Sequence, residues 1–563
     1  MDAIPQQVIR NVTRWKSNEV RSDDTNTQDD DKEDEYLMKL PLKLRSSMYE
    51  FQKEGFKFAV QKEGRCLIAD EMGLGKSIQA IAIAYHYRDD WPLLIIVPSS
   101  LTLTWKMEIL KWLKGCVFEH EINIIKKSSD TLLDFESNSY TAKPACPVTI
   151  MSYGLAVRKQ AELSDNKDLF GMIICDESHA LKNFNTHRCK VLLPLIKKNT
   201  KRAILLSGTP TNNRPSELHT QIDALRPDDF LTFKQYSLRY CEGKTTRFGW
   251  QANGAMHLKE LHAVISYRVM IRRCKSDVLT QLPDKIRTVV NIECDKSLEK
   301  KMKKKMAKDI ELKDEMDNIN DGMYDDSMDA VELDEEKTNV FDKKNKNMLE
   351  LYALTGKSKI KGIKEYIFDL FESGQKFLVF AHHQDVMNEI ETHVQNKCKT
   401  KYIRIDGNTS TDKRQLLVDK FQNEEGIRIA ILSITAAGTG LTLTAATSVV
   451  FAELYWSPSS LLQCEDRAHR ISQKSVVTVI YLLGKNSLDD RMWPMLKKKM
   501  KVISKTLSGK QLKMEVEQST DHFIKNNMEN HGDNHNNYCF DGSGGKQRTI
   551  TSMLTPVSKA KKT

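Results

Sequence analysis

The sequence predicts an α/β protein with two tandem lobes, each built around a parallel β-sheet. Two sets of short apolar runs are continuous and rich in branched side chains, as expected of strands buried on both faces of a sheet. Each run ends in a polar or glycine-bearing loop, and a charged stretch separates the two sets. Because strands with loops at their carboxyl ends and intervening helices form an open α/β sheet, a ligand site is expected along those loops.

The chain is long enough for several domains. At about 150 residues per domain, its 563 residues correspond to three or four units. We expect a disordered acidic tail at 1–43, a first lobe at 44–285, a charged linker or insertion at 286–345, a second lobe at 346–514 and a largely disordered tail at 515–563.

Composition excludes several classes of protein. The 86 Lys and Arg residues exceed the 76 Asp and Glu residues by 10, which permits a nucleic-acid partner without requiring one. No apolar run reaches the roughly 18 residues of a membrane-spanning helix, and the first residues lack the pattern of a secretion signal. The 11 cysteines have no metal-ligand spacing and are typical of core residues in a reducing compartment.

The apolar runs give the expected strands. In the first lobe they cover 66–69, 93–97, 172–175 and 203–206, and in the second lobe 377–380, 402–405, 429–432, 449–451 and 476–483.

The loop after the first strand has the composition of a phosphate site. Asp70 to Ser77 reads D-E-M-G-L-G-K-S, and a helical pattern follows it. Glycines such as Gly73 and Gly75 let backbone N–H groups surround phosphate oxygens at a helix N-terminus. Lys76 would reach the β- and γ-phosphates of ATP, and Ser77 would ligate Mg²⁺. The alternative is a tight glycine turn that binds nothing.

An acidic pair follows another strand of the same lobe. Nucleoside triphosphate hydrolysis needs one carboxylate to hold the metal and a second to orient water. Asp176 and Glu177 would divide those roles, with Asp176 on Mg²⁺. In isolation, an acidic loop exposed to solvent is the commoner arrangement. The segment Ser207-Gly208-Thr209-Pro210 adds a third loop at the same edge, which favours a site.

The second lobe carries two arginines that suit a role in hydrolysis. We expect a helix over 463–470, in which Gln463, Arg467 and Arg470 share one face at i, i+4 and i+7. An arginine supplied across a cleft neutralises charge that develops on the γ-phosphate. The alternative is a set of surface ion pairs with Glu465 or Asp466.

These motifs, in this order, resemble the series of the Swi/Snf-like ATPases of helicase superfamily two. The matching segments are 49–55, 70–77, 97–101, 176–179, 206–210, 380–383, 433–444 and 463–470. The resemblance implies two RecA-like lobes with ATP and Mg²⁺ in the cleft between them, and it accounts for Asp70 where a phosphate loop usually begins with glycine. The nucleotide-contacting residues that it implies are Gln52, Asp70, Gly73, Gly75, Lys76, Ser77, Gly440 and Gln463.

Four further segments are similar to the annealing-helicase branch of that family, and most of all to its zinc-finger members. These are 65–66, 91–95, 381–383 and 452–456. The branch implies a nuclear, DNA-dependent ATPase that moves on duplex or branched DNA and anneals or remodels strands at stalled replication forks in DNA repair. Ser472 departs from the family's H-R-I-G-Q pattern. Since the sequence contains neither a zinc finger nor an H-N-H region, no nuclease activity is expected.

Contacts with DNA are expected from loop hydroxyls and backbone amides, which position phosphates without reading bases. The candidates are Ser99, Ser100, Thr209 and Thr435, and the lysines at 301–305 would add salt-sensitive attraction.

The polar tail contains a segment similar to the peptide that binds the replication sliding clamp. Gln547, Ile550, Met553 and Leu554 have its spacing, but Met and Leu replace the two aromatic anchors. An unstructured tail is the alternative.

Three other functions are alternatives for such a sequence. A nucleosome-remodelling ATPase belongs to the same enzyme class. A non-catalytic DNA-structure adaptor would need none of Lys76, Asp176, Glu177, Arg467 and Arg470. An RNA helicase is disfavoured because the D-E-A-D form of the acidic motif is absent.

Overall fold

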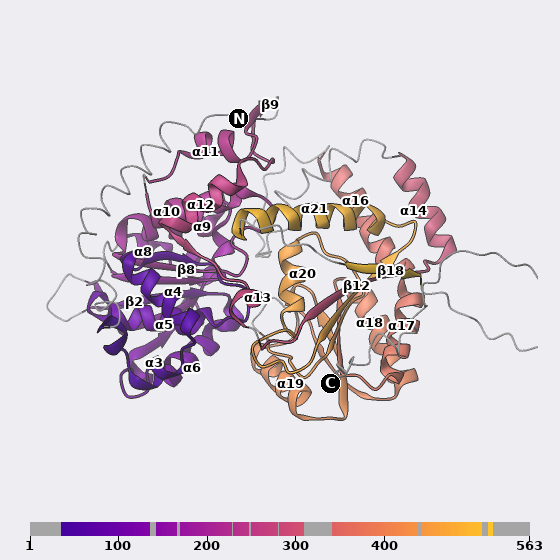
Figure 1. Ribbon diagram of the computed structural model, residues 1–563, viewed down its shortest axis with the longest axis horizontal. Coiled ribbons are helices and arrows are strands. Elements are labelled where there is room, and N and C mark those ends of the chain that lie inside the picture. Colours follow the sequence, from indigo (N-terminus) through magenta and orange to yellow (C-terminus); the bar gives the residue numbers. More distant parts are fainter. Residues whose placement is uncertain are drawn as a thin grey trace, which may run out of the picture.

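The computed structural model describes residues 35–135, 142–165, 169–227, 229–246, 249–279, 281–308, 341–436, 441–508 and 516–521. Within them, only the backbone is described for 135, 142, 165, 307–308, 341–346, 411–412 and 516–521. Figure 1 shows two lobes side by side, with α21 passing over the gap between them.

The first lobe is built on a parallel seven-stranded sheet with the order β11-β1-β8-β7-β2-β6-β3. Its strands are β1 Arg65–Ile68, β2 Leu93–Val97, β3 Ile122–Ile124, β6 Val148–Ser152, β7 Met172–Asp176, β8 Arg202–Leu206 and β11 Met270–Ile271. All four strands predicted for this lobe are confirmed. Separate apolar clusters cover the two faces, which explains why β2 is buried at every residue.

Helices surround this sheet. They are α3 Leu42–Ser47, α4 Glu50–Gln61, α5 Lys76–His86, α6 Thr102–Trp112, α7 Tyr153–Arg158, α8 Gln160–Asp165, α9 His187–Pro194, α10 His219–Leu225, α11 Phe233–Tyr240, α12 Leu258–Arg268 and α13 Lys275–Val278. Two antiparallel pairs lie outside the main sheet, β4 Leu133–Phe135 with β5 Ala142–Pro144, and β9 Lys244–Thr246 with β10 Gly249–Gln251.

The folded part begins earlier than expected. Leu37 and Leu40 are buried in a core cluster of the first lobe, at 7% and 4% exposure. The prediction of disorder over 1–43 is therefore wrong for residues 35–43. Residues 1–34 lie outside the described part of the chain.

The second lobe contains another parallel seven-stranded sheet, with the order β14-β15-β13-β16-β17-β12-β18. Its strands are β12 Lys285–Ile292, β13 Phe377–Ala381, β14 Lys401–Ile405, β15 Ile427–Ser433, β16 Ser448–Phe451, β17 Val477–Gly484 and β18 Val516–Asp521. The five strands predicted for this lobe are confirmed. Its helices are α14 Lys296–Lys308, α16 Phe341–Ser358, α17 Ile360–Glu372, α18 Gln384–His393, α19 Thr411–Asn423, α20 Pro458–Glu465 and α21 Asp489–Ser508.

One strand of the second sheet lies where a linker was expected. β12 pairs with β17 along its whole length, from Lys285 opposite Val477 to Ile292 opposite Gly484. The chain therefore enters the second lobe directly after α13, and the charged helix α14 follows that strand.

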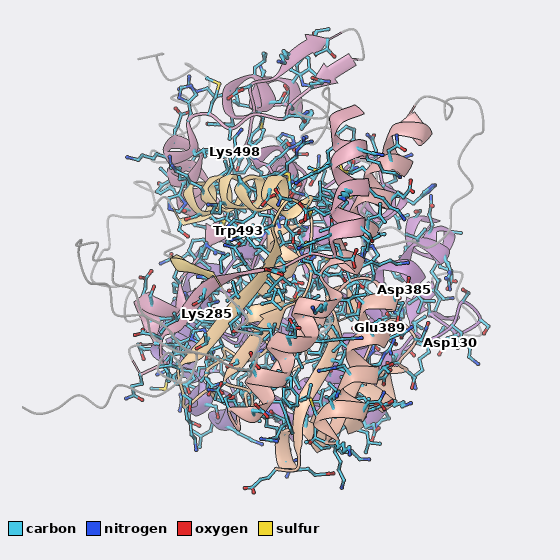
Figure 2. The ribbon with its side chains drawn as sticks, turned by 90° about the vertical axis from the view of Figure 1, so that its right-hand side faces the viewer. Asp130, Lys285, Asp385, Glu389, Trp493 and Lys498 are labelled. Carbon is cyan, nitrogen blue, oxygen red and sulfur yellow. The ribbon has the colours of Figure 1, made fainter. Side chains whose placement is uncertain are left out.

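The last described helix returns to the first lobe. Trp493 and Leu496 of α21 pack in the second-lobe core, whereas Ile503 and Leu507 belong to the first-lobe core. Figure 2 shows α21 crossing in front of the second sheet, with buried Trp493 and exposed Lys498 on opposite sides of the helix. The end of α21 thus binds the two lobes together.

No helix in the described residues is long and apolar enough to cross a membrane. Every cysteine in the same part of the chain is a free thiol, and none forms a disulfide there. The clamp-like segment with Gln547 and Leu554 lies outside the described residues.

Candidate functional site

The predicted phosphate loop connects β1 to the N-terminus of α5. Gly73 and Gly75 have φ angles of +84° and +71°, in the left-handed region that favours glycine. A Cβ atom on Gly75 would stand 2.5 Å from Nε2 of Gln52. The loop therefore needs glycine at Gly75 for both backbone conformation and space.

Gln52 fixes this loop to α4. Its Nε2 donates to the carbonyl of Leu74 at 2.9 Å, and its Oε1 accepts from the amide of Tyr49 at 3.0 Å. The side chain is 3% exposed. Gln52 thus lies directly against the phosphate loop, and its predicted contact with adenine stays a prediction.

Lys76 is the first residue of α5, and Ser77 follows it half-buried. The ammonium of Lys76 donates to the carbonyl of Asp70 at 3.0 Å. Burial lowers the pKa of Lys76, while the nearby carboxylates of Glu177 and Asp176 act against that change. A cation held in this loop beside two carboxylates suits phosphate oxygens and a metal.

Asp70 differs from its expected role as a nucleotide contact. Its carboxylate is fully buried and accepts from the backbone and guanidinium of Arg273 at 2.6–3.0 Å and from Nε2 of Gln79 at 2.9 Å. Since the protein itself uses both oxygens, we assign Asp70 to positioning the loop.

Asp176 lies at the end of β7, at the same edge of the sheet. Trp105 Nε1 donates to its Oδ2 at 2.9 Å, and the amide of Glu177 donates to its Oδ1 at 2.8 Å. Burial, followed by the charge of Glu177, raises the pKa of Asp176 to about 6. Tyr153 donates to the Asp176 carbonyl at 2.8 Å, which fixes the strand end.

Glu177 takes a left-handed backbone conformation, with φ +50°, that turns it away from the strand. Its Oε2 lies 3.3 Å from Nδ1 of His179. Burial would raise the pKa of Glu177, but His179, Lys76 and Arg467 together lower it. The pKa values of the two carboxylates are therefore shifted in opposite directions.

The third predicted loop is hydrogen-bonded to the acidic one. Ser178 donates to Gln221 Oε1 at 2.8 Å, and Gln221 Nε2 donates to the carbonyl of Pro210 at 2.7 Å. The Ser207 hydroxyl lies 3.3 Å from His179 Nδ1 and accepts from the amide of Thr209 at 3.2 Å. These hydrogen bonds thus fix the loop after β7 and the loop after β8 relative to each other.

The proposed DNA-contacting residues differ in exposure. Ser99 and Thr435 are exposed and Ser100 is half-buried, whereas Thr209 is only 4% exposed. Thr209 is therefore a poor candidate for direct contact.

The arginine segment was predicted to be one helix over 463–470, and this prediction is wrong. α20 ends at Glu465, and Arg467 and Arg470 lie in the turns that follow. Glu465 binds the Arg287 guanidinium at 2.8 and 2.6 Å, and Asp466 binds Lys275 and Lys285 at 2.9 and 3.0 Å. The acidic neighbours are therefore occupied by lysines and an arginine from other elements.

Arg470 meets the phosphate loop of the other lobe. A Cβ atom on Gly73 would stand 3.2 Å from its Cγ. Its guanidinium donates to the hydroxyl of Thr442 at 2.5 Å and to the carbonyl of Asp466 at 3.2 Å. Burial, and then the charge of Arg467, lowers the pKa of Arg470 to about 9. Arg467 is 4% exposed.

Gln463 is 7% exposed and lies in the last turn of α20. Gly440 lies outside the described residues. The contacts of Gln463 and Gly440 with a nucleotide stay predictions.

Sequence reasoning missed three residues of this region. Arg272 donates to the carbonyls of Ala69 and Gly208 at 2.6 and 2.8 Å, Arg273 binds Asp70, and Lys275 binds Asp466. The run R-R-C-K at 272–275 was a visible signal, but its partners stand far away in the sequence.

These residues fit a Mg²⁺-bound nucleoside triphosphate. The glycine loop opens on a helix of 11 residues, and Lys76, Asp176 and Arg470 gather around it. Among the described residues, no three or more His, Cys, Asp or Glu form a metal cluster. Mg²⁺ suits this arrangement because it is commonly held by few protein ligands together with phosphate oxygens.

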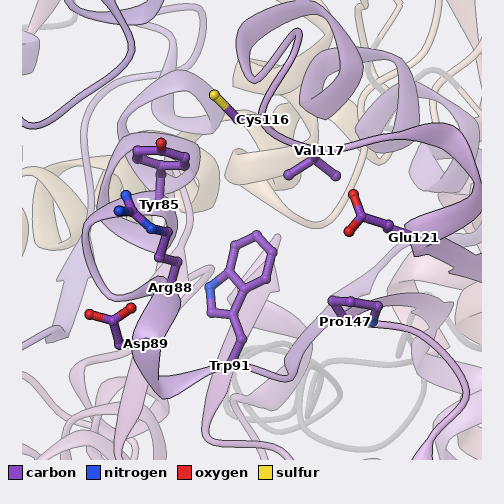
Figure 3. Close-up of a pocket in the computed structure, with 8 residues that line it drawn as sticks. All are labelled: Tyr85, Arg88, Asp89, Trp91, Cys116, Val117, Glu121 and Pro147. Atoms are coloured by element: carbon purple, nitrogen blue, oxygen red, sulfur yellow. The ribbon is translucent and has the colours of Figure 1, made fainter.

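A separate pocket of about 250 Å³ lies on the first lobe (Figure 3). Trp91 stands in its middle, with Tyr85 and Arg88 on one side and Glu121 on the other. It contains none of the residues described above, so it is distinct from the candidate site.

Two family profiles match the two lobes of the chain. A profile of the SNF2-related domain matches residues 51–346, and one of the helicase conserved C-terminal domain matches 358–472. The chain is 41% identical over 490 residues to the Xenopus tropicalis SWI/SNF-related matrix-associated actin-dependent regulator of chromatin subfamily A-like protein 1, covering 87% of this chain and 48% of the relative. It is 42% identical over 493 residues to the Homo sapiens DNA annealing helicase and endonuclease ZRANB3, covering 86% of this chain and 42% of the relative.

The chain therefore spans about half the length of these curated relatives or less. Among solved structures, the Sulfolobus solfataricus SWI2/SNF2 ATPase core in complex with dsDNA is 22% identical, with a TM-score of 0.36, over 82% of this chain and 93% of that one.

Proposed function

The chain belongs to the SNF2-related family, and we propose that it is a DNA-dependent ATPase that anneals or remodels duplex and branched DNA at stalled replication forks. The observation that supports this most is the meeting of Arg470 with Gly73, because it brings both lobes to one phosphate site. The similarity to a relative named as a DNA annealing helicase favours annealing over strand separation.

The side chains divide the work of hydrolysis among them. ATP with Mg²⁺ supplies the phosphoryl group and the metal charge. Lys76 and the loop amides would bind phosphate oxygens, Asp176 and Ser77 would hold the metal, and Glu177 would orient the attacking water. Arg470 and Arg467 would neutralise the charge that develops during transfer.

Coupling to DNA follows from the two-lobed site. Exposed hydroxyls at Ser99 and Thr435 lie on different lobes, so each lobe would hold the duplex backbone separately. Closing and opening of the cleft would then shift one grip relative to the other. Backbone contacts carry little base information, so binding would depend on DNA structure.

The lysines of α14 contribute less than their number suggests. Lys303 is paired with Glu299 at 2.7 Å, and Lys305 is paired with Glu350 at 2.5 Å. Lys301 and Lys304 are exposed and would supply the salt-sensitive attraction for DNA.

Replacement of Lys76 tests the ATPase assignment. Lys76→Ala should abolish ATP turnover on forked DNA, since the loop loses the cation that binds phosphate. DNA binding measured by fluorescence anisotropy should remain within about threefold of wild type, because Lys76 contacts no predicted DNA surface. Retained turnover in this variant would mean that the phosphate site has been misassigned.

Annealing is tested separately by rewinding of a DNA bubble coated with single-strand-binding protein. The wild-type protein should rewind the bubble with ATP, whereas Lys76→Ala should not. If the wild-type protein hydrolysed ATP but did not rewind the bubble, the ATPase assignment would stand and the annealing function would be refuted.

A nucleosome-remodelling ATPase is the second candidate, favoured by relatives named as SWI/SNF-related regulators of chromatin. Sliding of a positioned nucleosome at the protein concentration that rewinds DNA would favour it. We also propose a nuclear location for the protein. A further proposal is that residues 547–554 bind the replication sliding clamp, which fluorescence anisotropy of a peptide covering 545–559 mixed with the clamp would test.

A further inference from the structure

A short segment of the first lobe lies between the phosphate loop and the arginine segment of the second lobe. The segment runs from β11 into α13, next to β1 and its loop. The amide of Glu71 donates to the carbonyl of Arg273 at 3.0 Å, and the amide of Lys275 donates to Glu71 Oε2 at 2.8 Å. Residues 273–275 are thus bonded directly to the residues that begin the phosphate loop.

The side chain of Lys275 reaches the opposite lobe. Its Nζ lies 2.9 Å from Asp466 Oδ1 and donates to the carbonyl of His469 at 2.6 Å. The side chain is only 4% exposed. A lysine is rarely buried in this way unless its charge is paired, and here Asp466 and His469, which contact the ammonium, both lie on the second lobe.

The residues that Lys275 holds surround the two arginines of the site. Asp466 directly precedes Arg467, and His469 directly precedes Arg470. The carbonyl of Asp466 also accepts from Nε of Arg470 at 3.2 Å. A shift of this turn would therefore move Arg470 from its place beside Gly73.

We propose that Lys275 is a positioning residue that joins the phosphate loop to the arginine turn and so sets Arg470 against Gly73. One backbone amide and one side chain of the same residue contact the two halves of the site. Lys275 does not touch the reacting atoms and acts through Arg470. The proposal rests on the proposed ATPase function and adds to it a residue that couples lobe closure to hydrolysis.

The chain offers a closely matched control. Lys359 is also buried, at 1% exposure, and also binds one carboxylate and one carbonyl, Asp489 at 2.8 Å and Leu482 at 3.0 Å. All three residues lie within the second lobe. Lys359→Met therefore removes the same kind of buried contact without breaking a link between lobes.

The test compares Lys275→Met and Lys359→Met, each alone and combined with Arg470→Ala, in the full chain. We expect Lys275→Met to lower kcat for DNA-stimulated ATP hydrolysis by about 10- to 100-fold, because small displacements of catalytic groups cost this much. The Kd for a fluorescent ATP analogue should change by less than about threefold, since the phosphate loop keeps Lys76.

The combined variants separate positioning from general damage to the fold. If Lys275 acts through Arg470, Lys275→Met should change kcat by less than about twofold in the Arg470→Ala background. If Lys359→Met lowers kcat, the fold-loss in its double variant with Arg470→Ala should instead equal the product of the two single fold-losses. The proposal would be overturned if the kcat losses of Lys275→Met and Arg470→Ala multiplied in the double variant. It would also be overturned if Lys275→Met alone kept kcat within twofold of wild type.

A second variant covers the case in which Lys275→Met does not fold. Glu71→Ala breaks the same link from the phosphate-loop side, at a half-buried position, and should show the same lack of additivity with Arg470→Ala. Absence of turnover in the wild-type protein would instead refute the proposed function itself, so the two failures are distinguishable.

Discussion

Asp70 shows why a residue in a ligand-binding motif need not contact the ligand. Its buried carboxylate would be costly without partners, and the backbone and side chain of Arg273 together with Gln79 supply them. The phosphate loop is therefore anchored to the segment that follows β11. This anchoring is part of what keeps Lys76 and Gly75 in place.

Glu465, beside the arginine turn, is held by three partners from other elements. It binds Arg287 through two hydrogen bonds, Lys285 at 2.9 Å and the hydroxyl of Tyr481 at 2.7 Å. Burial would raise its pKa, but the charges of Arg287 and Lys285 lower the pKa from its usual 4.5 to about 2. Folding therefore favours the ionised form of Glu465.

The pH dependence of stability follows from this shift. Because the folded pKa lies below the unfolded one, the stabilisation is complete above about pH 5 and is lost as the pH falls toward 2. Glu465→Gln should lower the free energy of unfolding by about 3 kcal/mol at pH 7.5 and should lower the Tm accordingly. The difference in Tm should shrink to a little over half at about pH 3.5.

Scanning fluorimetry of both proteins at pH 7.5, 4.5 and 3.5 checks this. Glu391→Gln is the control, since its pair with Arg404 is partly exposed and should contribute little. A gap in Tm that stays constant with pH would contradict the assignment.

The residues of the site were predictable where the chemistry lies within a few consecutive positions. Asp176 ends an apolar strand and Glu177 follows it, while Lys76 begins the helix after the loop that follows another strand, so their place at the sheet edge follows from the order of residues. Lys275 was not predictable in this way. Its side chain contacts Asp466, which stands 191 positions later (466 − 275 = 191).

Helices and strands, too, were predictable where the local sequence determines them and not where distant partners do. β2 and β7 were predicted because nearly every residue is apolar, which leaves few alternatives to a buried strand. β12 was not predicted, since Lys285, Arg287 and Asn291 interrupt its apolar residues and its partner β17 lies far along the chain. The predicted helix over 463–470 ends early because Glu465 and Asp466 turn toward Arg287, Lys275 and Lys285.

The helix α21 is the element whose role local patterns did not reveal. It begins in the second-lobe core and ends in the first, where Ser508 accepts from Arg272 at 3.2 Å. Its amphipathic pattern predicts a buried stripe but not which lobe covers each half of that stripe.

Two leucine truncations test the division of α21 between lobes. Leu507→Ala and Leu496→Ala both remove fully buried side chains, so each should lower stability by about 2–5 kcal/mol. Hydrogen exchange should show lost protection in α12 for Leu507→Ala and in β17 for Leu496→Ala. Loss confined to the second lobe in both variants would contradict the docking of α21 on the first lobe.

Contacts between the two lobes are found at several places among the described residues. They include α21, the segment with Lys275, and the contact of Arg470 with Gly73. None follows from the pattern of either lobe alone, although the two-lobed architecture itself does. The arrangement explains how a site can depend on closure, since the first lobe supplies Lys76 and Asp176 while the second supplies the arginines.

Turnover by Arg470→Ala tests this dependence most directly. Loss of an arginine that neutralises charge only during transfer should lower kcat on forked DNA by about 10³-fold or more. The Kd for ATP should stay within about threefold of wild type, because Lys76 and the loop amides are intact. Arg428→Ala, which removes an arginine stacked on Phe371 in the same lobe, serves as the control and should turn over within about twofold of wild type. Hydrolysis by Arg470→Ala at the wild-type rate would show that the second lobe does not complete the site.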